Sequence, residues 1–153
     1  AGGVAGMRLS SGDKVASMDV VEPGGYMVLV TIQGYGKRTS LDEYPAKGRA
    51  TGGVATLSKG VLEKTGVISA ARVMQEDDDL TVISANGMVL RMKVREVREA
   101  GRATRGVRLM EIKEGDKVAS IARIAKATLT KVGASVSEAT TPGANQQFEL
   151  PIK

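Results

Sequence analysis

The sequence contains no cysteine, histidine or tryptophan among its 153 residues. Without cysteine it can form neither a disulfide nor a thiolate metal site. Without histidine it lacks the commonest metal ligand and the usual general base, so a Ser–His or Cys–His nucleophile cannot be assembled. Phosphate-binding glycine loops of the Walker or Rossmann type are also missing. We therefore expect no catalytic residues, no metal site and no cofactor.

Aromatic side chains and long apolar runs are scarce as well. Three tyrosines and one phenylalanine are the whole aromatic supply. Proteins that bind single strands need aromatic platforms for base stacking, so this composition favours contacts with a duplex backbone instead. The sequence shows no apolar run of 18 residues and no charged-then-apolar leader. We expect a cytoplasmic protein with no membrane partner.

A repeat of about 50 residues organises the rest of the chain. The motif Arg-Ala-Thr-Gly-Gly-Val at 49–54 returns at 102–107 as Arg-Ala-Thr-Arg-Gly-Val, and Gly-Asp-Lys-Val-Ala-Ser at 12–17 returns unchanged at 115–120. Repetition at this period is typical of propeller-like arrays. We expect units near residues 1–48, 49–101 and 102–133. They are followed by a partly flexible tail over 134–153, with a candidate edge strand at 147–152.

Each unit is predicted to consist of short antiparallel strands. Runs rich in β-branched residues alternate with turn signals, of which Asn86-Gly87 between apolar runs is the strongest. Strands are expected at 27–32, 37–41, 67–73, 80–83, 90–95 and 118–124. The acidic run 76–79 could in principle hold a hard cation, but a solvated turn is the favoured interpretation. The predicted fold class is all-β, an array of antiparallel four-stranded blades.

Positive charge is concentrated in one part of the chain. Residues 91–108 carry seven basic residues and two acidic ones, an excess equal to the net charge of +5 of the whole chain. Within them Arg91, Lys93 and Arg95 alternate with apolar residues, which predicts a strand with one wholly cationic face. Such a cluster is the expected footprint of a polyanion binder. A solvated charged face, or protection of a sheet edge, is the structural alternative.

Longer motifs add a family resemblance. The stretch Gly-Tyr-Gly-Lys-Arg-Thr at 34–39, with Glu-Tyr-Pro-Ala-Lys at 43–47 and the motif at 49–54, resembles the C-terminal domain of bacterial DNA gyrase A. The stretch 101–109 does so too. The resemblance covers residues 1 to about 125 and corresponds to the C-terminal half of that domain. It implies a six-bladed β-pinwheel in which neighbouring blades exchange a strand. The glutamine-, arginine- and glycine-rich gyrase A box of that family is absent.

The resemblance also implies a function and partners. It implies a non-catalytic module that bends and wraps duplex DNA around a basic rim, in support of ATP-dependent negative supercoiling by a type II topoisomerase. The implied partners are duplex DNA, the rest of gyrase A, and gyrase B, beside the bacterial nucleoid. ATP hydrolysis and strand cleavage belong to other parts of that enzyme. The alternatives are the related C-terminal domain of topoisomerase IV, and a protein-interaction array whose basic face meets an acidic partner.

The residues expected to face DNA follow from the same alignment. They are Lys37, Arg38, Lys47, Arg49, Arg91, Lys93, Arg95, Arg98, Arg102 and Arg105. Arg49 and Arg102 have an alternative role, in which they brace an inter-blade loop by bonding backbone carbonyls. Because three units cannot close a six-bladed ring, we expect either a homodimer or a tail, at 144–152, that covers the open edge.

Overall fold

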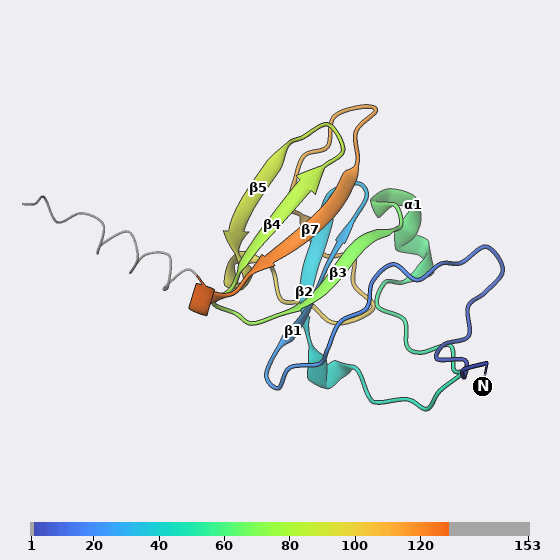
Figure 1. Cartoon of the computed structure of the whole chain (residues 1–153). Coiled ribbons are helices and arrows are strands. Elements are labelled where there is room, and N and C mark those ends of the chain that lie inside the picture. Colours follow the sequence, from blue (N-terminus) through green and yellow to red (C-terminus); the bar gives the residue numbers. More distant parts are fainter. Residues whose placement is uncertain (1, 129–153) are drawn as a thin grey trace, which may run out of the picture.

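The computed structural model describes residues 2–128, which form two antiparallel sheets (Figure 1). The first sheet has the order β3-β1-β2-β6 and contains β1 (Tyr26–Thr31), β2 (Tyr35–Ser40), β3 (Ile68–Met74) and β6 (Val107–Arg108). The second has the order β5-β4-β7 and contains β4 (Asp79–Ser84), β5 (Val89–Lys93) and β7 (Val118–Ile124). The expected tail and its edge strand lie outside the described residues.

Helical elements in the described part of the chain are short. They are η1 (Leu41–Glu43), η2 (Lys59–Val61), α1 (Leu62–Thr65) and η3 (Val94–Glu96), and residues 126–128, at the end of the described part, are also helical. No helix among residues 2–128 has the length and apolar character needed to cross a membrane.

The all-β, antiparallel architecture predicted from the sequence is confirmed. Each expected strand agrees with an observed one to within two residues at either end. Gly87 of the predicted Asn86-Gly87 turn has a positive φ of 87°, and Gly34, in the turn between β1 and β2, has a φ of 78°. One difference is that β5 ends at Lys93, so Arg95 lies in the helical turn η3 and not on the strand.

The first copy of the repeat departs from the prediction, because residues 2–25 contain no strand (Figure 1, dark blue). Residues 12–17, whose sequence returns at 115–120 where β7 begins, lead into a stretch that runs beside the unpaired edge of β3. There the Ser17 hydroxyl and the Asp19 carboxylate accept the Ala71 and Val73 amides, at 3.0 Å each. Side chains therefore occupy the donors that a backbone ladder would use, and no strand pairing develops.

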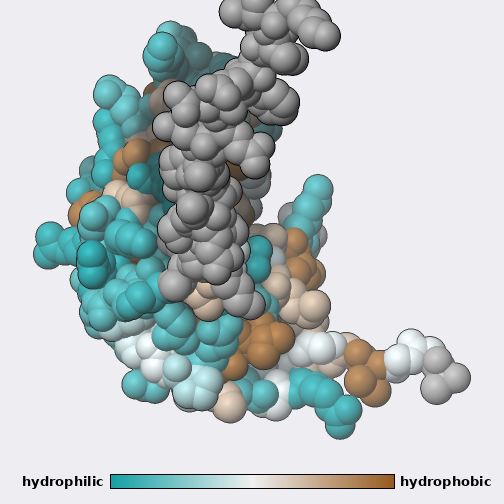
Figure 2. All heavy atoms as spheres, turned by 60° about the vertical axis from the view of Figure 1, so that its left-hand side comes forward, coloured by the Kyte–Doolittle hydropathy of each residue, from teal (hydrophilic) through white to brown (hydrophobic). Residues whose placement is uncertain are grey.

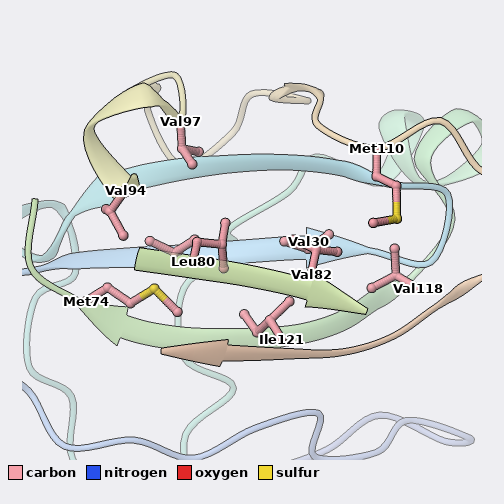
Figure 3. Packing of buried hydrophobic residues seen from close by; sticks show 10 residues of the cluster. Val30, Met74, Leu80, Val82, Val94, Val97, Met110, Val118 and Ile121 are labelled. Atoms are coloured by element: carbon pink, nitrogen blue, oxygen red, sulfur yellow. The ribbon is translucent and has the colours of Figure 1, made fainter. Parts of the chain in front are cut away.

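The hydrophobic core lies between the two sheets (Figure 3). It is made of aliphatic and methionine side chains, as the scarcity of aromatic residues requires. The first sheet contributes Val28, Val30 and Met74, the second contributes Leu80, Val82, Val118 and Ile121, and the connections contribute Val94, Val97 and Met110. Because both sheets supply residues to this one core, stacking the blades is what buries their apolar faces.

Strand β6 and the segment before it link the two sheets. Strand β6 follows β5 in the chain but pairs with β2 of the first sheet, where Val107 lies opposite Gly36 and Arg108 opposite Tyr35. A strand of the third unit thus completes a sheet whose other strands come from the first and second units, an exchange of the kind that the resemblance implied. The segment that leads to β6 must therefore cross from one sheet to the other.

Candidate nucleic-acid interface

The basic residues singled out from the sequence fall into three environments. Lys37 and Arg38 are buried, whereas Arg91, Lys93 and Arg95 form ion pairs at the surface. The others form no ion pair with any described residue; they are Lys47, Arg49, Arg98, Arg102 and Arg105. Figure 2 shows a face of the molecule that is largely hydrophilic, with smaller apolar patches.

Lys37 lies inside the protein and not on its rim. The residue is fully buried, and its Nζ donates to the carbonyl oxygens of Gly101 at 2.7 Å and Arg102 at 2.5 Å. Thr104 Oγ1 is a third partner at 3.4 Å. Burial lowers the pKa of Lys37 to about 8, against the opposing attraction of Glu43. The expectation that Lys37 reaches the surface is therefore corrected.

Arg38 is corrected in the same way. Its Nε donates to the Val97 carbonyl at 2.9 Å, and its two terminal nitrogens lie 3.2 Å from Glu76 and 3.4 Å from Glu99. The guanidinium also stacks over the Tyr26 ring at 4.5 Å. Each of the three guanidinium nitrogens has a partner and the side chain is buried, so Arg38 does not belong to the proposed interface.

The face of β5 is less cationic than the sequence pattern predicted. Arg91 Nε donates to Asp79 at 2.7 Å, and Lys93 pairs with the other oxygen of the same carboxylate. Asp79 belongs to the neighbouring strand β4, opposite Lys93, so it separates two like charges that would otherwise repel. Arg95 reaches Asp77 at 3.6 Å. This surface therefore carries less net positive charge than its sequence indicates.

The acidic turn 76–79 is occupied by basic partners. Its pairs are Glu76 with Arg38, Asp77 with Arg95 and Lys126, Asp78 with Arg123, and Asp79 with Arg91 and Lys93. The hydrogen bond from Lys93 lowers the pKa of Asp79, and that from Lys126 lowers the pKa of Asp77. No group of three or more acidic residues in the described part of the chain is arranged to hold a metal ion. The turn serves to join strands and blades.

The strongest unneutralised charge lies on residues 98–108, which we call the arginine segment. Arg98, Arg105 and Arg108 are exposed and Arg102 is half-buried. None of the four forms an ion pair with a residue that the structure describes. The segment crosses from the second sheet to β6 of the first, so the four guanidinium groups follow the junction between the blades. Planar guanidinium forks are well suited to phosphate oxygens.

Tyr35 orders one end of the arginine segment. The guanidinium carbons of Arg105 and Arg108 lie 5.8 and 5.2 Å from the centre of its ring. Arg108 also donates to the Tyr35 hydroxyl at 3.0 Å, and this hydrogen bond raises the pKa of Arg108. The two arginines are thus held against one aromatic ring while they remain exposed.

Lys47 and Arg49 lie on a separate exposed loop after η1. The loop is held against the N-terminal segment by the Ala50 amide, which donates to Gly6, and by the Arg8 amide, which donates to Thr51. The bracing role considered for Arg49 and Arg102 is not observed, because neither guanidinium bonds a carbonyl of residues 2–128. Lys37 fulfils that role at the Arg102 loop.

Comparison with known proteins decides the family. The family model described as "DNA gyrase C-terminal domain, beta-propeller" matches residues 1–22, 25–73 and 78–125. The chain belongs to the DNA gyrase C-terminal domain family. It is 41% identical over 139 residues to DNA gyrase A of Mycolicibacterium smegmatis, and 42% identical over 134 residues to that of Mycobacterium leprae. These alignments cover 91% and 88% of this chain but 16% and 10% of the relatives, so the chain spans a small part of their length.

Two solved structures show the same fold. A structure of the DNA gyrase A C-terminal domain aligns with 65% of this chain and 33% of its own, at a TM-score of 0.61 and 26% identity. The C-terminal domain of DNA topoisomerase IV aligns with 89% of this chain and 42% of its own, at a TM-score of 0.74 and 24% identity. The second likeness concerns the fold alone.

Two residues of this gyrase C-terminal domain were missed as site candidates. Arg108 belongs to the basic cluster 91–108 in the sequence, and that membership was the available signal. Tyr35 gave no such signal, because the arginines that stack on it lie about 70 residues further along the chain.

Proposed function

We propose that this chain is a non-catalytic DNA-binding module of DNA gyrase A that bends duplex DNA along its basic surface. The arginine segment carries the proposal, because it places four guanidinium groups without acidic partners among the described residues at one blade junction. Lys47 and Arg49 add two exposed basic residues on a separate loop. Phosphate contacts from such groups supply affinity that does not depend on base sequence.

In the parent enzyme, the bend would support wrapping and ATP-dependent negative supercoiling. The chemical steps would then belong to the rest of gyrase A and to gyrase B, in the bacterial cytoplasm beside the nucleoid. A homodimer of this piece is a further proposal, which the mass from light scattering checks.

Duplex binding is tested by fluorescence anisotropy with two unrelated duplexes over a range of salt concentrations. Because each phosphate contact contributes about −0.9 to the slope of log K against log salt, four contacts predict a slope of about −3 to −4. The two duplexes should bind with similar affinity. Circularisation of a duplex of about 150 base pairs by ligase then measures bending, since a stiff fragment of that length closes slowly unless it is bent.

A pair of matched triple variants locates the interface. Arg98→Gln, Arg102→Gln and Arg105→Gln remove three charges without described acidic partners, whereas Arg91→Gln, Lys93→Gln and Arg95→Gln remove three charges that are already paired. We expect the first set to reduce the salt slope by about three and the second set by much less. No duplex binding by the wild type at low salt would favour the alternative, a basic face that meets an acidic protein.

A further inference from the structure

Three successive side chains of β2 bond the backbone of the neighbouring blade. Lys37 donates to the carbonyls of residues 101 and 102, Arg38 to that of Val97, and Thr39 Oγ1 to that of Ala100 at 2.6 Å. We infer that Lys37, which makes two of these four bonds, is a positioning residue that fixes the arginine segment in the shape that contacts DNA. The inference rests on the proposed function.

The chemistry of Lys37 suits this role. An ammonium has three donors, and the site offers three acceptors: the carbonyls of Gly101 and Arg102 and the hydroxyl of Thr104. Its charge is buried and forms no ion pair with any described residue. Burying a cation in this way carries a desolvation cost that an apolar side chain would avoid. The residue is therefore poorly explained by stability and well explained by the geometry that it imposes.

The backbone held by Lys37 is also held from its other side. The Arg102 amide donates to Glu43 Oε2 at 3.1 Å, so residue 102 is bonded through both its N–H and its carbonyl. The Thr104 amide and hydroxyl both return to the Gly101 carbonyl, at 3.2 and 2.8 Å, and close the turn. The loop is thus tied to β2 and to η1 at adjacent residues.

The same loop leaves its arginine side chains free of ion pairs with described residues. Arg98, whose carbonyl accepts the Arg38 amide at 3.1 Å, is exposed, and so is Arg105 just beyond the closed turn. Fixing the backbone before DNA arrives reduces the ordering cost of binding, because the loop has less freedom to lose. Lys37 thus acts on DNA through residues that lie far along the chain but that it holds in space.

The repeat supplies a comparison. Lys37 and Thr39 correspond to Leu90 and Met92 in the next unit, where only the arginine between them is retained as Arg91. Leucine and methionine cannot donate hydrogen bonds to a backbone carbonyl. The three-residue contact is therefore particular to the junction that carries the arginine segment, and it is not a general requirement of a blade.

The experiment compares the variant Lys37→Met with Lys64→Met, which removes one exposed charge from α1. In Lys37→Met we expect duplex affinity to fall about three- to tenfold, and the salt slope to weaken by about one, because fewer phosphates are met together. Lys64→Met should change affinity less than about twofold. Hydrogen exchange of the Arg102 and Thr104 amides should quicken in Lys37→Met while exchange in β1 and β4 stays unchanged.

Two further variants separate positioning from stability. Val82→Ala destabilises the core without touching the loop, so it should leave the salt slope unchanged at equal or greater loss of stability. Thr39→Val removes only the bond to Ala100. It should quicken exchange at the loop and weaken duplex binding in the same direction as Lys37→Met, but less, and it provides the test if Lys37→Met does not fold. Unchanged exchange at residues 102 and 104 would overturn the inference whether or not DNA binds. Faster exchange at these amides in Lys37→Met, together with an affinity for DNA equal to that of the wild type, would also overturn the inference. Failure of the wild type to bind any duplex would instead refute the proposed function.

Discussion

Gly106 packs directly on Gly36, so closely that a Cβ on Gly106 would lie 2.4 Å from the Gly36 carbonyl oxygen. Gly106 also has a φ of 77°, in the region that side chains disfavour. This contact lets the arginine segment turn into β6 and join the first sheet. Any side chain at residue 106 must push the exchanged strand away from β2.

Gly106→Ala should therefore cost more stability than the same change at a similar but open glycine. Gly87 is a suitable control, because its φ is 87° and a Cβ there would meet no atom within 4 Å. We expect Gly87→Ala to lower the free energy of unfolding by about 1 kcal/mol, from backbone strain alone. Gly106→Ala should lower it by at least about 2 kcal/mol, as measured by urea unfolding. Equal losses of unfolding free energy in the two variants would show that β6 can move away from β2 without destabilising the protein.

Asp79→Asn should strengthen DNA binding while it weakens the fold. The change removes the carboxylate shared by Arg91 and Lys93 and so releases two positive charges on β5. Asp42→Asn, at an exposed residue of η1 without an ion pair to any described residue, alters the net charge equally and serves as the control. Anisotropy should show a larger gain in affinity for Asp79→Asn than for Asp42→Asn. Identical gains would mean that only net charge matters.

Two strand arginines also provide a test of buried ion pairs. Arg123 of β7 is mostly buried and bonds Asp78 at 2.6 Å and Glu22 at 2.5 Å, whereas Arg72 of β3 is 43% exposed and bonds Asp19. Arg123→Met leaves the buried Asp78 carboxylate without its main partner and should cost about 3 kcal/mol of stability. Arg72→Met should cost less than about 1 kcal/mol. Thermal unfolding of both variants, measured together, decides whether burial controls the difference.

Alkaline pH should stabilise the protein through Lys37. Its pKa is about 8 in the folded state and near 10.5 when unfolded, so between these values the unfolded chain binds more protons. The free energy of unfolding should therefore rise with pH across that window, by up to about 3 kcal/mol from this residue. A neutral amine keeps two donors for the loop.

The contribution of Lys37 is the free energy of unfolding of the wild type minus that of Lys37→Met at each pH. The titration of all other groups cancels in this difference. The negative charge of Glu43, which faces Lys37, raises the pKa of Lys37 and so opposes the effect of burial. It therefore narrows the pH range over which the stability changes. A difference that stays flat between pH 8 and 10.5 would contradict the depressed pKa.

The sequence predicted the strands well because their signals are local. Asn86-Gly87 and the β-branched runs around it determine a hairpin without reference to the rest of the chain. The burial of β2 was beyond such reasoning. The polar residues 37–39 resemble an exposed strand in the sequence, and they are buried because a segment about 60 residues later covers them. Their partners are backbone carbonyls, which leave no mark in a sequence pattern.

The candidate site was predictable in its charge and not in its pairing. The basic cluster at 91–108 is visible in the sequence, but which members are neutralised depends on contacts across strands and blades. Asp79 reaches Arg91 because β4 and β5 pair in one register, and Glu22 reaches Arg123 over 101 residues of sequence. Such partners follow from the assembled sheets, and no local pattern contains them.

The unequal junctions of the repeat have a mechanical consequence. A segment packed on β2 is tied by directional hydrogen bonds from Lys37 and Thr39, which resist sliding and rotation together. A segment packed in the same way on β5 would meet Leu90 and Met92, which offer dispersion contacts without direction. Under a bending load from DNA, compliance should therefore be concentrated beyond β5, while the β2 junction transmits the load as a stiff element.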